Sequence, residues 1–289
     1  MQETCRLCGS KSRFMFTHEV LGRHQVNYFE CESCASLQTE KPHWLDEAYA
    51  IPGVHVDVGQ AARVVQTWVR LCFLLETIGF DKQRECIDYG GSAGLLTRLM
   101  RDSGYRYLAY DTYDDSKYAN YFKVSRLENV SPGLVSAFEV FEHFPQPAES
   151  IGELFAIKPD LIVFSTVFYE GQGPDWEYLV PYCGQHIFFY REQALRAFGE
   201  RHGYALRRSQ DFWLMIRETS PYLAAFDAKH TATLDAAFVG ELFLRVGHGT
   251  EQTLQDYSYA KDRFISELGA VRRSAAKPKN LLRRFLGLA

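Results

Sequence analysis

The strongest constraint on the fold of this chain is a glycine-rich turn between two apolar stretches. Residues 84–89 form a strand candidate in which an apolar run, Cys86 and Ile87, ends in Asp88, and the turn at 90–94 follows directly. After a helical pattern comes a second strand candidate, 105–110, which closes on Asp111. In such units the glycines carry no side chain and let a nucleoside approach the backbone closely. The second acid accepts hydrogen bonds from ribose hydroxyls. The pattern therefore predicts a nucleoside site.

The turn also restricts which nucleoside is expected. A dinucleotide fingerprint needs three glycines, but only Gly90 is in place, with Ser92 and Leu95 at the other two positions. No Gly-Lys-Ser/Thr follows, so the turn is not a phosphate loop either. A nucleoside without phosphates is favoured.

The order of these motifs resembles that of the class I S-adenosylmethionine (SAM)-dependent methyltransferases. Asp88, Gly90 and Gly94 match the first motif of that family, with Ser92 in place of its middle glycine. The fourth-strand motif is similar to residues 139–143, which read Glu-Val-Phe-Glu-His. The resemblance covers about residues 60 to 217. The alternative is a generic fold of the same class that binds no cofactor.

The resemblance implies a cofactor, SAM, and a set of residues to hold it. The ribose-binding acid falls on Asp111, and Glu139 is expected at the methionine end of the cofactor. Arg63 is expected to pair with the cofactor carboxylate, or else to form a surface salt bridge. The full predicted set is Asp88, Tyr89, Gly90, Gly94, Asp111, Thr112, Glu139 and Arg63.

The alternation of apolar runs predicts an α/β fold with a doubly wound, mostly parallel sheet. The expected strands are 84–89, 105–110, 121–124, 134–140 and 160–166. The expected helices are 60–78, 93–103, 148–157 and 191–202. A hairpin of 204–208 and 211–217 is expected to place one antiparallel strand in the sheet, as in the methyltransferase fold.

Two cysteine pairs near the N-terminus predict a structural zinc site. Cys5 and Cys8 form the first pair, and Cys31 and Cys34 form the second. Four thiolates in two such pairs can bind one zinc ion tetrahedrally. The metal then stabilises a segment that is too short to build its own core. The alternative is a set of unpaired surface thiols.

Four regions are expected along the chain. They are a zinc ribbon (1–40), a connector with a helix (41–80), the SAM-binding methyltransferase domain (81–217) and a C-terminal helical region with a basic tail (218–289). The C-terminal helices are expected to cap the active site or to form a dimer surface. Residues 272–289 carry six cations and no acid, so the tail is either an amphipathic helix on an anionic membrane or a frayed end.

Composition narrows the class of protein. The 289 residues are 46% hydrophobic with a net charge of −4, which is ordinary for a globular protein. No apolar run has the length of a bilayer span and no signal peptide is evident, so the expected location is cytoplasmic, with peripheral membrane contact through the tail as an option. Residues 1–40 hold four cations and five acids, which argues against nucleic acid as a partner.

The catalytic groups are expected in the loops after the fourth and fifth strands, 141–147 and 167–190, because ligands lie at the carboxyl ends of strands in open α/β sheets. His186 is the first candidate for a general base, with a structural histidine as the alternative. Glu142 and His143 are the second candidates; in some methyltransferases such a pair lies near the acceptor or a divalent metal. The alternative for Glu142 is a favourable charge at a helix start.

The aromatic loop 167–190 favours a small-molecule acceptor. The Gly-Gln-His of this loop is similar to that in methyltransferases of polysaccharide and natural-product pathways. This resemblance implies that the methyl group is transferred to a hydroxyl of a free or nucleotide-linked sugar. Three alternatives stay open: carbon methylation of a keto-sugar, an RNA methyltransferase, and a non-catalytic scaffold. The sequence predicts no oligomeric state.

Overall fold

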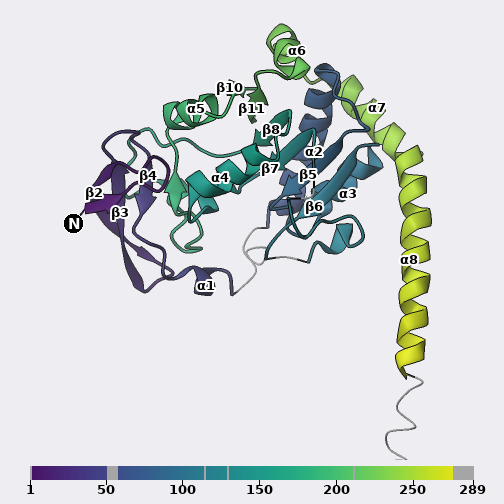
Figure 1. The fold of residues 1–289 in the computed structure, drawn as a ribbon, viewed down its shortest axis with the longest axis horizontal. Coiled ribbons are helices and arrows are strands. Elements are labelled where there is room, and N and C mark those ends of the chain that lie inside the picture. The colour runs from purple at the N-terminus through teal and green to yellow at the C-terminus, as the bar shows by residue number, and fades with distance from the viewer. Residues whose placement is uncertain (1, 51–57, 114, 129, 211, 276–289) are drawn as a thin grey trace, which may run out of the picture.

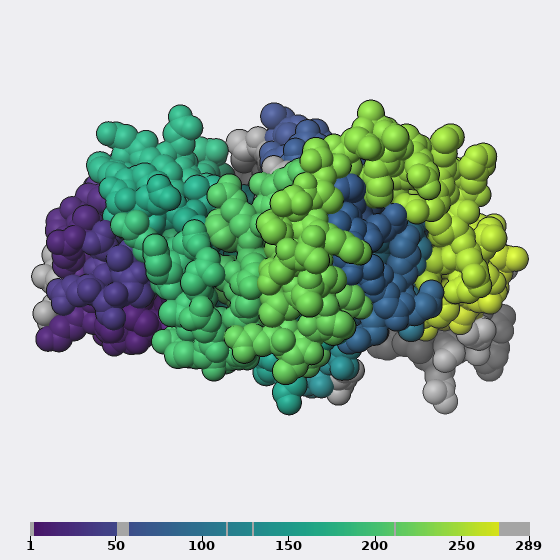
Figure 2. All heavy atoms as spheres, turned by 90° about the horizontal axis from the view of Figure 1, so that it is seen from above, coloured from purple at the N-terminus to yellow at the C-terminus, as the bar shows by residue number. Residues whose placement is uncertain are grey.

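The computed structural model describes residues 2–50, 58–113, 115–128, 130–210 and 212–275. Two β-sheets organise these residues, a small one built mainly from the N-terminus and a larger one in the centre of the chain. The small sheet lies at one end of the molecule, and helix α8 (Glu251–Ala275) lies at the other (Figure 1). Figure 2 shows the same order from a perpendicular direction, from purple to yellow.

The central sheet has six strands in the order β10-β11-β8-β7-β5-β6. Their bounds are β5 (Glu85–Tyr89), β6 (Arg106–Tyr110), β7 (Leu134–Ala137), β8 (Leu161–Phe164), β10 (Tyr204–Arg208) and β11 (Trp213–Arg217). Neighbours among β5 to β8 are parallel, whereas β11 is antiparallel to both β8 and β10. The predicted mostly parallel sheet with one antiparallel strand is confirmed.

Helices cover both faces of this sheet, as predicted. Successive side chains of a strand point to opposite faces. Ile87 and Ile162 lie in one apolar cluster with α4 and α5, whereas Cys86 and Leu161 lie in another with α2 and α3. The bounds are α2 (Gln60–Thr77), α3 (Leu95–Asp102), α4 (Pro147–Ala156) and α5 (Glu192–Glu200). The core thus consists of two apolar layers that hold the carboxyl ends of β5 and β7 side by side.

The prediction of a full strand at 121–124 is wrong. This segment forms a single parallel bridge between Ala109 and Lys123, with hydrogen bonds from Ala109 N to Phe122 O and from Val124 N to Ala109 O. None of the residues 121–124 is buried. Because strand pairing is stabilised by packing of a buried face, a segment without one extends the sheet by only one bridge.

The small sheet joins the N-terminal ribbon to a loop of the central domain. Its order is β1-β2-β3-β4-β9, with bounds β1 (Gln2–Thr4), β2 (Lys11–Val20), β3 (His24–Cys31), β4 (Leu37–Thr39) and β9 (Phe188–Phe189). Strand β9 comes from the loop after β8, and Leu37 pairs with Phe189. Tyr28 of the ribbon shares an apolar cluster with Ile187 of that loop. The ribbon therefore supports the segment that carries His186.

The C-terminal region contains helices, as predicted: α6 (Pro221–Lys229), α7 (Ala236–Gly247) and α8. Helix α6 contacts β11, α7 contacts α2, and α8 contacts α3. Tyr222, Phe226 and Leu242 are buried against the α2 side of the sheet. These contacts lie on a face of the sheet, so α6 and α7 extend the core.

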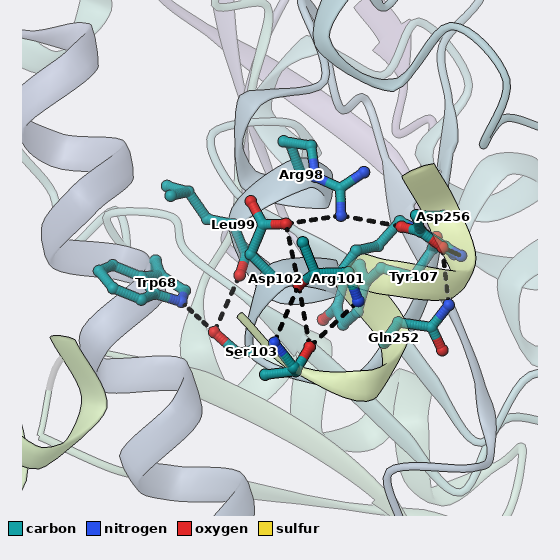
Figure 3. Close-up of polar contacts among 11 residues, drawn as sticks. Trp68, Arg98, Leu99, Arg101, Asp102, Ser103, Tyr107, Gln252 and Asp256 are labelled. Atoms are coloured by element: carbon teal, nitrogen blue, oxygen red, sulfur yellow. Dashed lines mark hydrogen bonds and ion pairs between the residues drawn. The ribbon is translucent and has the colours of Figure 1, made fainter. Parts of the chain in front are cut away.

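A buried ion pair fixes α8 to α3 (Figure 3). The Arg101 guanidinium donates to both carboxylate oxygens of Asp256, at 2.6 Å each. Arg98 donates to Asp256 at 2.8 Å and to Asp102 at 2.7 Å. Arg101 and Asp256 are 7% and 4% exposed, which makes the pair part of the core. Removing one partner of a buried pair of this kind strongly destabilises the folded protein.

Within the described ranges, no helix combines the length and apolarity needed to cross a bilayer. Most of the predicted basic tail, residues 276–289, lies outside the described residues. The backbone of 272–275 continues α8. The predictions of a membrane-bound or frayed tail stay untested.

Candidate active site

The glycine turn has a backbone that only small residues tolerate. Gly90 has φ +70°, and a Cβ there would meet Val140 Cγ2 at 2.6 Å. Gly94 precedes α3 with φ +78°, and its Cβ would meet the Cβ of Ala119 at 2.8 Å. Glycine is the residue that adopts this left-handed region without steric cost. The turn thus exposes backbone at the carboxyl end of β5, where ligands of such sheets bind.

Asp88 lies beneath this turn. Its carboxylate accepts hydrogen bonds from Thr97 Oγ1 at 3.0 Å and from Ser136 Oγ at 2.9 Å. Burial raises the pKa of Asp88 to about 6, although these two hydrogen bonds act in the opposite direction. Asp88 therefore ties β5, α3 and β7 together under the turn, and its predicted role toward a cofactor stays a prediction.

Asp111 organises the second half of the predicted nucleoside site. Its carboxylate accepts from the backbone N of Ser92 at 2.8 Å and from that of Tyr113 at 2.7 Å. The turn and the end of β6 are thereby held together at the predicted ribose position. Ser92 itself has φ +47°, a left-handed value that is uncommon outside glycine. Thr112 follows Asp111 in an exposed bend.

Glu139, at the end of β7, is the second residue with unusual backbone at this edge. It has φ +54°, and its backbone N donates to Ser165 Oγ at 2.9 Å while that hydroxyl donates to Glu139 Oε1 at 2.5 Å. Left-handed conformations of non-glycine residues cluster at functional sites. The rings of Tyr89 and Tyr110 are tilted by 37° to each other, with centroids 5.2 Å apart. The predicted cofactor contacts of Glu139 and Tyr89 stay predictions.

Arg63 lies in the first turn of α2 and is exposed. Its guanidinium lies over Gly59, where a Cβ would approach Nη1 to 2.8 Å. Its predicted pairing with a cofactor carboxylate stays a prediction.

Glu142, His143 and His186 meet in one cluster. One ligand-type atom of each residue lies within 4.8 Å of the others. Glu142 and His143 belong to a short 3-10 turn after β7, and His186 comes from the loop after β8. A hydrogen bond from Ile187 N to Glu142 O, at 2.9 Å, joins the two loops. The structure thus brings together all three predicted catalytic residues, which we call the triad.

Glu142 is fully buried, and neither of its carboxylate oxygens has a hydrogen-bond partner. The hydroxyls of Tyr178 and Thr166 lie near the Glu142 carboxylate and act to lower its pKa. Neither of them forms a hydrogen bond of normal geometry with it. Burial, assisted by the charge of Glu139, raises the pKa of Glu142 to about 8. An unpaired buried carboxyl group is costly for folding, and groups of this kind are candidates for function.

The two histidines are held in defined orientations. Nδ1 of His186 lies 2.7 Å from the carbonyl oxygen of Tyr178, so it carries the proton and leaves Nε2 as the acceptor. Nδ1 of His143 lies 3.1 Å from the hydroxyl of Tyr49. Burial lowers the pKa of His143 to about 3 and lowers that of His186 below its usual value. Both imidazoles are therefore neutral near pH 7.

Tyr49 is a site residue that the sequence analysis does not place at the active site. Besides its contact to His143, its ring stacks on that of Tyr113, at 4.5 Å and nearly parallel. Tyr113 is two residues from Asp111, and its backbone N donates to that carboxylate. The connector therefore lies between the predicted ribose site and the triad. No periodic pattern marks Tyr49, so only the folded chain reveals this position.

Much of the aromatic content of loop 167–190 is structural. Tyr169, Phe188, Phe189 and Tyr190 are fully buried in the ribbon and the sheet core. The aromatic character that predicted an acceptor pocket thus partly reflects packing between the ribbon and this loop, whereas Tyr182 is exposed.

The four predicted zinc ligands converge in the ribbon. Cys5 Sγ lies 3.7 Å from Cys34 Sγ, and Cys8 Sγ lies 3.5 Å from Cys31 Sγ. Sulfurs bound tetrahedrally to one zinc at about 2.3 Å lie roughly 3.8 Å apart, so these spacings fit a Cys₄ site. The turns are closed by Gly9 N to Cys5 O and Ala35 N to Cys31 O. The cluster is compatible with zinc, and the metal itself stays a prediction.

Comparison with known proteins decides the family. The profile described as "Methyltransferase domain" matches residues 60–209, which is more than half of the chain. The chain belongs to the methyltransferase-domain family. It is a SAM-dependent methyltransferase, as its motifs predicted. The matched residues run from the first helix of the central domain to the end of β10.

Solved structures similar to this methyltransferase have low sequence identity. Magnesium protoporphyrin IX methyltransferase from Synechocystis PCC 6803, with bound S-adenosylhomocysteine (SAH), is 14% identical; the match covers 60% of this chain and 92% of that chain with a TM-score of 0.43. An O-methyltransferase family protein from Burkholderia thailandensis is 16% identical, over 59% and 61% of the two chains, with a TM-score of 0.44. No curated protein matches the methyltransferase.

Two hollows of the methyltransferase surface lie away from the triad. One is lined by α2 and α6, including Phe73 and Phe226. The other lies beneath α8, beside Arg101 and Asp256. Neither is lined by a predicted cofactor or catalytic residue, so neither is assigned to catalysis.

Proposed function

We propose that this methyltransferase transfers a methyl group from SAM to a hydroxyl of a small polar acceptor, a sugar or nucleotide-linked sugar, at the triad. The observation that carries the proposal is the convergence of Glu142, His143 and His186 at the carboxyl ends of β7 and β8. The predicted cofactor turn follows β5, the strand next to β7. Donor and acceptor sites on neighbouring strand ends meet the need of an in-line displacement for two aligned reactants.

The triad contains a base for the proton that the acceptor hydroxyl must lose. His186 is neutral near pH 7, and its Nδ1 is bonded to the Tyr178 carbonyl, so Nε2 has the free lone pair that takes the acceptor proton. The acceptor oxygen then bonds to the methyl carbon as the sulfur–carbon bond breaks, and SAH leaves. A small sugar is favoured over RNA because the ribbon has more acids than cations, four cations against five acids in residues 1–40.

The test is an SAH-release assay with SAM and a panel of nucleotide sugars, keto-sugars, phenols and transfer RNA, with products analysed by NMR. An O-methyl sugar supports the proposal. A new carbon–methyl bond on a keto-sugar, methylated RNA, or no SAM binding at all contradicts it; the last result favours a scaffold.

His186→Asn keeps a donor for the Tyr178 carbonyl but removes the base, so turnover is expected to fall by about 100-fold or more. His230→Asn is the matched control, at an exposed histidine whose Nδ1 lies 3.0 Å from the Asp227 carbonyl oxygen and whose ring stacks on Phe226. A near-normal rate for His186→Asn excludes His186 as the base.

A further inference from the structure

We propose that the outer face of α8 binds a second copy of this chain, as an antiparallel two-helix coiled coil with two-fold symmetry. Helix α8 lies at one end of the molecule (Figure 1). The proposal is independent of the reaction and of its substrate. It is carried by the spacing of the apolar residues of α8, by their exposure and by the charges beside them.

One side of α8 packs against its own domain. Asp256 binds Arg101 of α3 (Figure 3). Tyr259 and Glu267 contact the segment after β6, Tyr259 through its ring and Glu267 through a 3.1 Å hydrogen bond from a tyrosine hydroxyl. In a helix of 3.6 residues per turn, positions 256, 259 and 267 lie on one side. This inner side is therefore occupied by contacts within the chain.

A narrow, mostly apolar stripe lies on another side of α8. Its members are spaced alternately three and four residues apart, and we call them the seam: Leu254, Tyr257, Lys261, Phe264, Leu268 and Val271. At about 100° per residue, the seam is centred roughly 120° around the helix from the inner side. A repeat of 3.5 residues is the pattern of a coiled coil, in which each side chain fits between four residues of a facing helix.

The apolar side chains on and beside the seam are large and exposed. Five residues are between 39% and 71% exposed: Leu254, Tyr257, Phe264, Ile265 and Leu268. Within the described ranges, none of these five belongs to an apolar cluster of the core. They expose roughly 100 Å² each. Two copies would thus bury about 1,000 Å², the lower limit for a specific interface.

The pattern and charge of α8 favour a second copy over a membrane. Residues 251–275 carry four acids and four cations, so the helix has no excess of positive charge for an anionic bilayer. A heptad seam instead requires a facing helix with the same repeat and a similar length. Helix α8 of a second copy supplies both, and two-fold symmetry lets the same surface serve on each chain.

The residues of the seam fit an antiparallel pair better than a parallel one. In an antiparallel pair, Lys261 faces Phe264 of the second copy and lies about one turn from Glu267 of the second copy, which has the opposite charge. Tyr257 then faces Leu268 of the second copy. In a parallel pair, the two Lys261 side chains would face each other, and their like charges would destabilise the seam.

The test is sedimentation velocity of the full-length protein from micromolar to near-millimolar concentration. The wild type is expected to change from one chain to two as the concentration rises. Phe264→Glu places a charge in the seam and is expected to raise the dissociation constant of the dimer by at least about tenfold. Ser266→Glu adds the same charge at an exposed position off the seam, and this matched control should associate like the wild type. Circular dichroism checks that both variants are folded.

A charge exchange tests the antiparallel direction. Lys261→Glu should weaken the dimer, because it brings a second acid close to Glu267 of the other copy. The double variant Lys261→Glu/Glu267→Lys should restore the association. A wild type that stays a single chain at near-millimolar concentration, or equal association of wild type and Phe264→Glu, overturns the proposal. A double variant that associates no better than Lys261→Glu overturns it as well.

Discussion

The hydroxyl of Tyr49 lies 3.1 Å from Nδ1 of His143, although 94 positions separate the two residues in the chain. Tyr49 belongs to the connector that follows the ribbon, and His143 belongs to the turn after β7. The contact makes the connector part of the candidate active site.

Tyr49→Phe tests this contact. The variant keeps the ring stacked on Tyr113 but removes the hydroxyl, so His143 loses one orienting hydrogen bond. A net hydrogen bond contributes about 1 kcal/mol, and turnover is expected to fall severalfold while SAH affinity is unchanged. Tyr113→Phe, at a ring that is 73% exposed, is the control. Equal turnover in both variants would refute a positioning role for Tyr49.

Asp111→Asn tests the predicted ribose contact. The amide cannot accept all the hydrogen bonds that the carboxylate accepts from Ser92 N and Tyr113 N, nor those of two ribose hydroxyls. SAH affinity measured by calorimetry is expected to weaken by about 1–3 kcal/mol. Asp115→Asn, an exposed acid of the same loop, should bind SAH normally. Unchanged affinity in Asp111→Asn excludes the ribose role.

Asp88→Asn tests the buried carboxyl group under the turn through the pH dependence of stability. The pKa of Asp88 is raised to about 6 in the folded chain, mainly by burial. The folded state thus holds the proton more tightly than the unfolded state, and this stabilisation is complete below about pH 4 and lost as pH rises through about 6. Relative to wild type, the Asn variant should gain on the order of 3 kcal/mol between about pH 4 and about pH 7.

Urea unfolding at several pH values measures this difference. Asp262→Asn, on the exposed face of α8, is the matched control and should follow the wild-type curve. A pH-independent difference between Asp88→Asn and wild type would show that the carboxyl group titrates normally in the folded chain.

Cys8→Ser tests the link between the ribbon and the catalytic loop. The wild type is expected to contain one zinc per chain and the variant much less, because the site has lost one of four thiolates. Hydrogen exchange should then rise in the loop around His186, since β9 pairs with β4 of the ribbon. Cys72→Ala, in the core of α2, should keep the metal. Equal metal content in wild type and Cys8→Ser would contradict the zinc site.

Asp256→Ala tests the attachment of α8. The variant leaves the buried Arg101 guanidinium without its partner, and the free energy of unfolding is expected to fall by about 3–5 kcal/mol. Asp262→Ala on the exposed face serves as the control for helix propensity. A loss equal to that of the control would show that the pair does not contribute.

The parts of this fold that the sequence predicts are those set by local pattern. Gly90 and Gly94 mark the turn because glycine alone suits their backbone, and helix α2 follows its apolar spacing from Gln60 to Thr77. The cysteine spacing likewise brings four sulfurs together. The turn and the helix depend on neighbouring residues, which a sequence displays directly, and the cysteines are marked by the short spacing within each pair.

The parts that the sequence does not predict depend on contacts between distant segments. The bridge at Lys123 stops after one pair because residues 121–124 lack a buried face. Phe188 and Phe189 read as an acceptor pocket, but they pair with the ribbon and lie in the core. The contact of Tyr49 with His143 has no local signal at all.

The most direct measurement is a crystal structure of the protein with SAH and a nucleotide sugar. We expect the adenosine over the turn at Gly90, its ribose on Asp111, and the sulfur directed toward a sugar hydroxyl beside Glu142 and His186. Adenosine bound elsewhere, or a triad closed off from both ligands, would contradict the account.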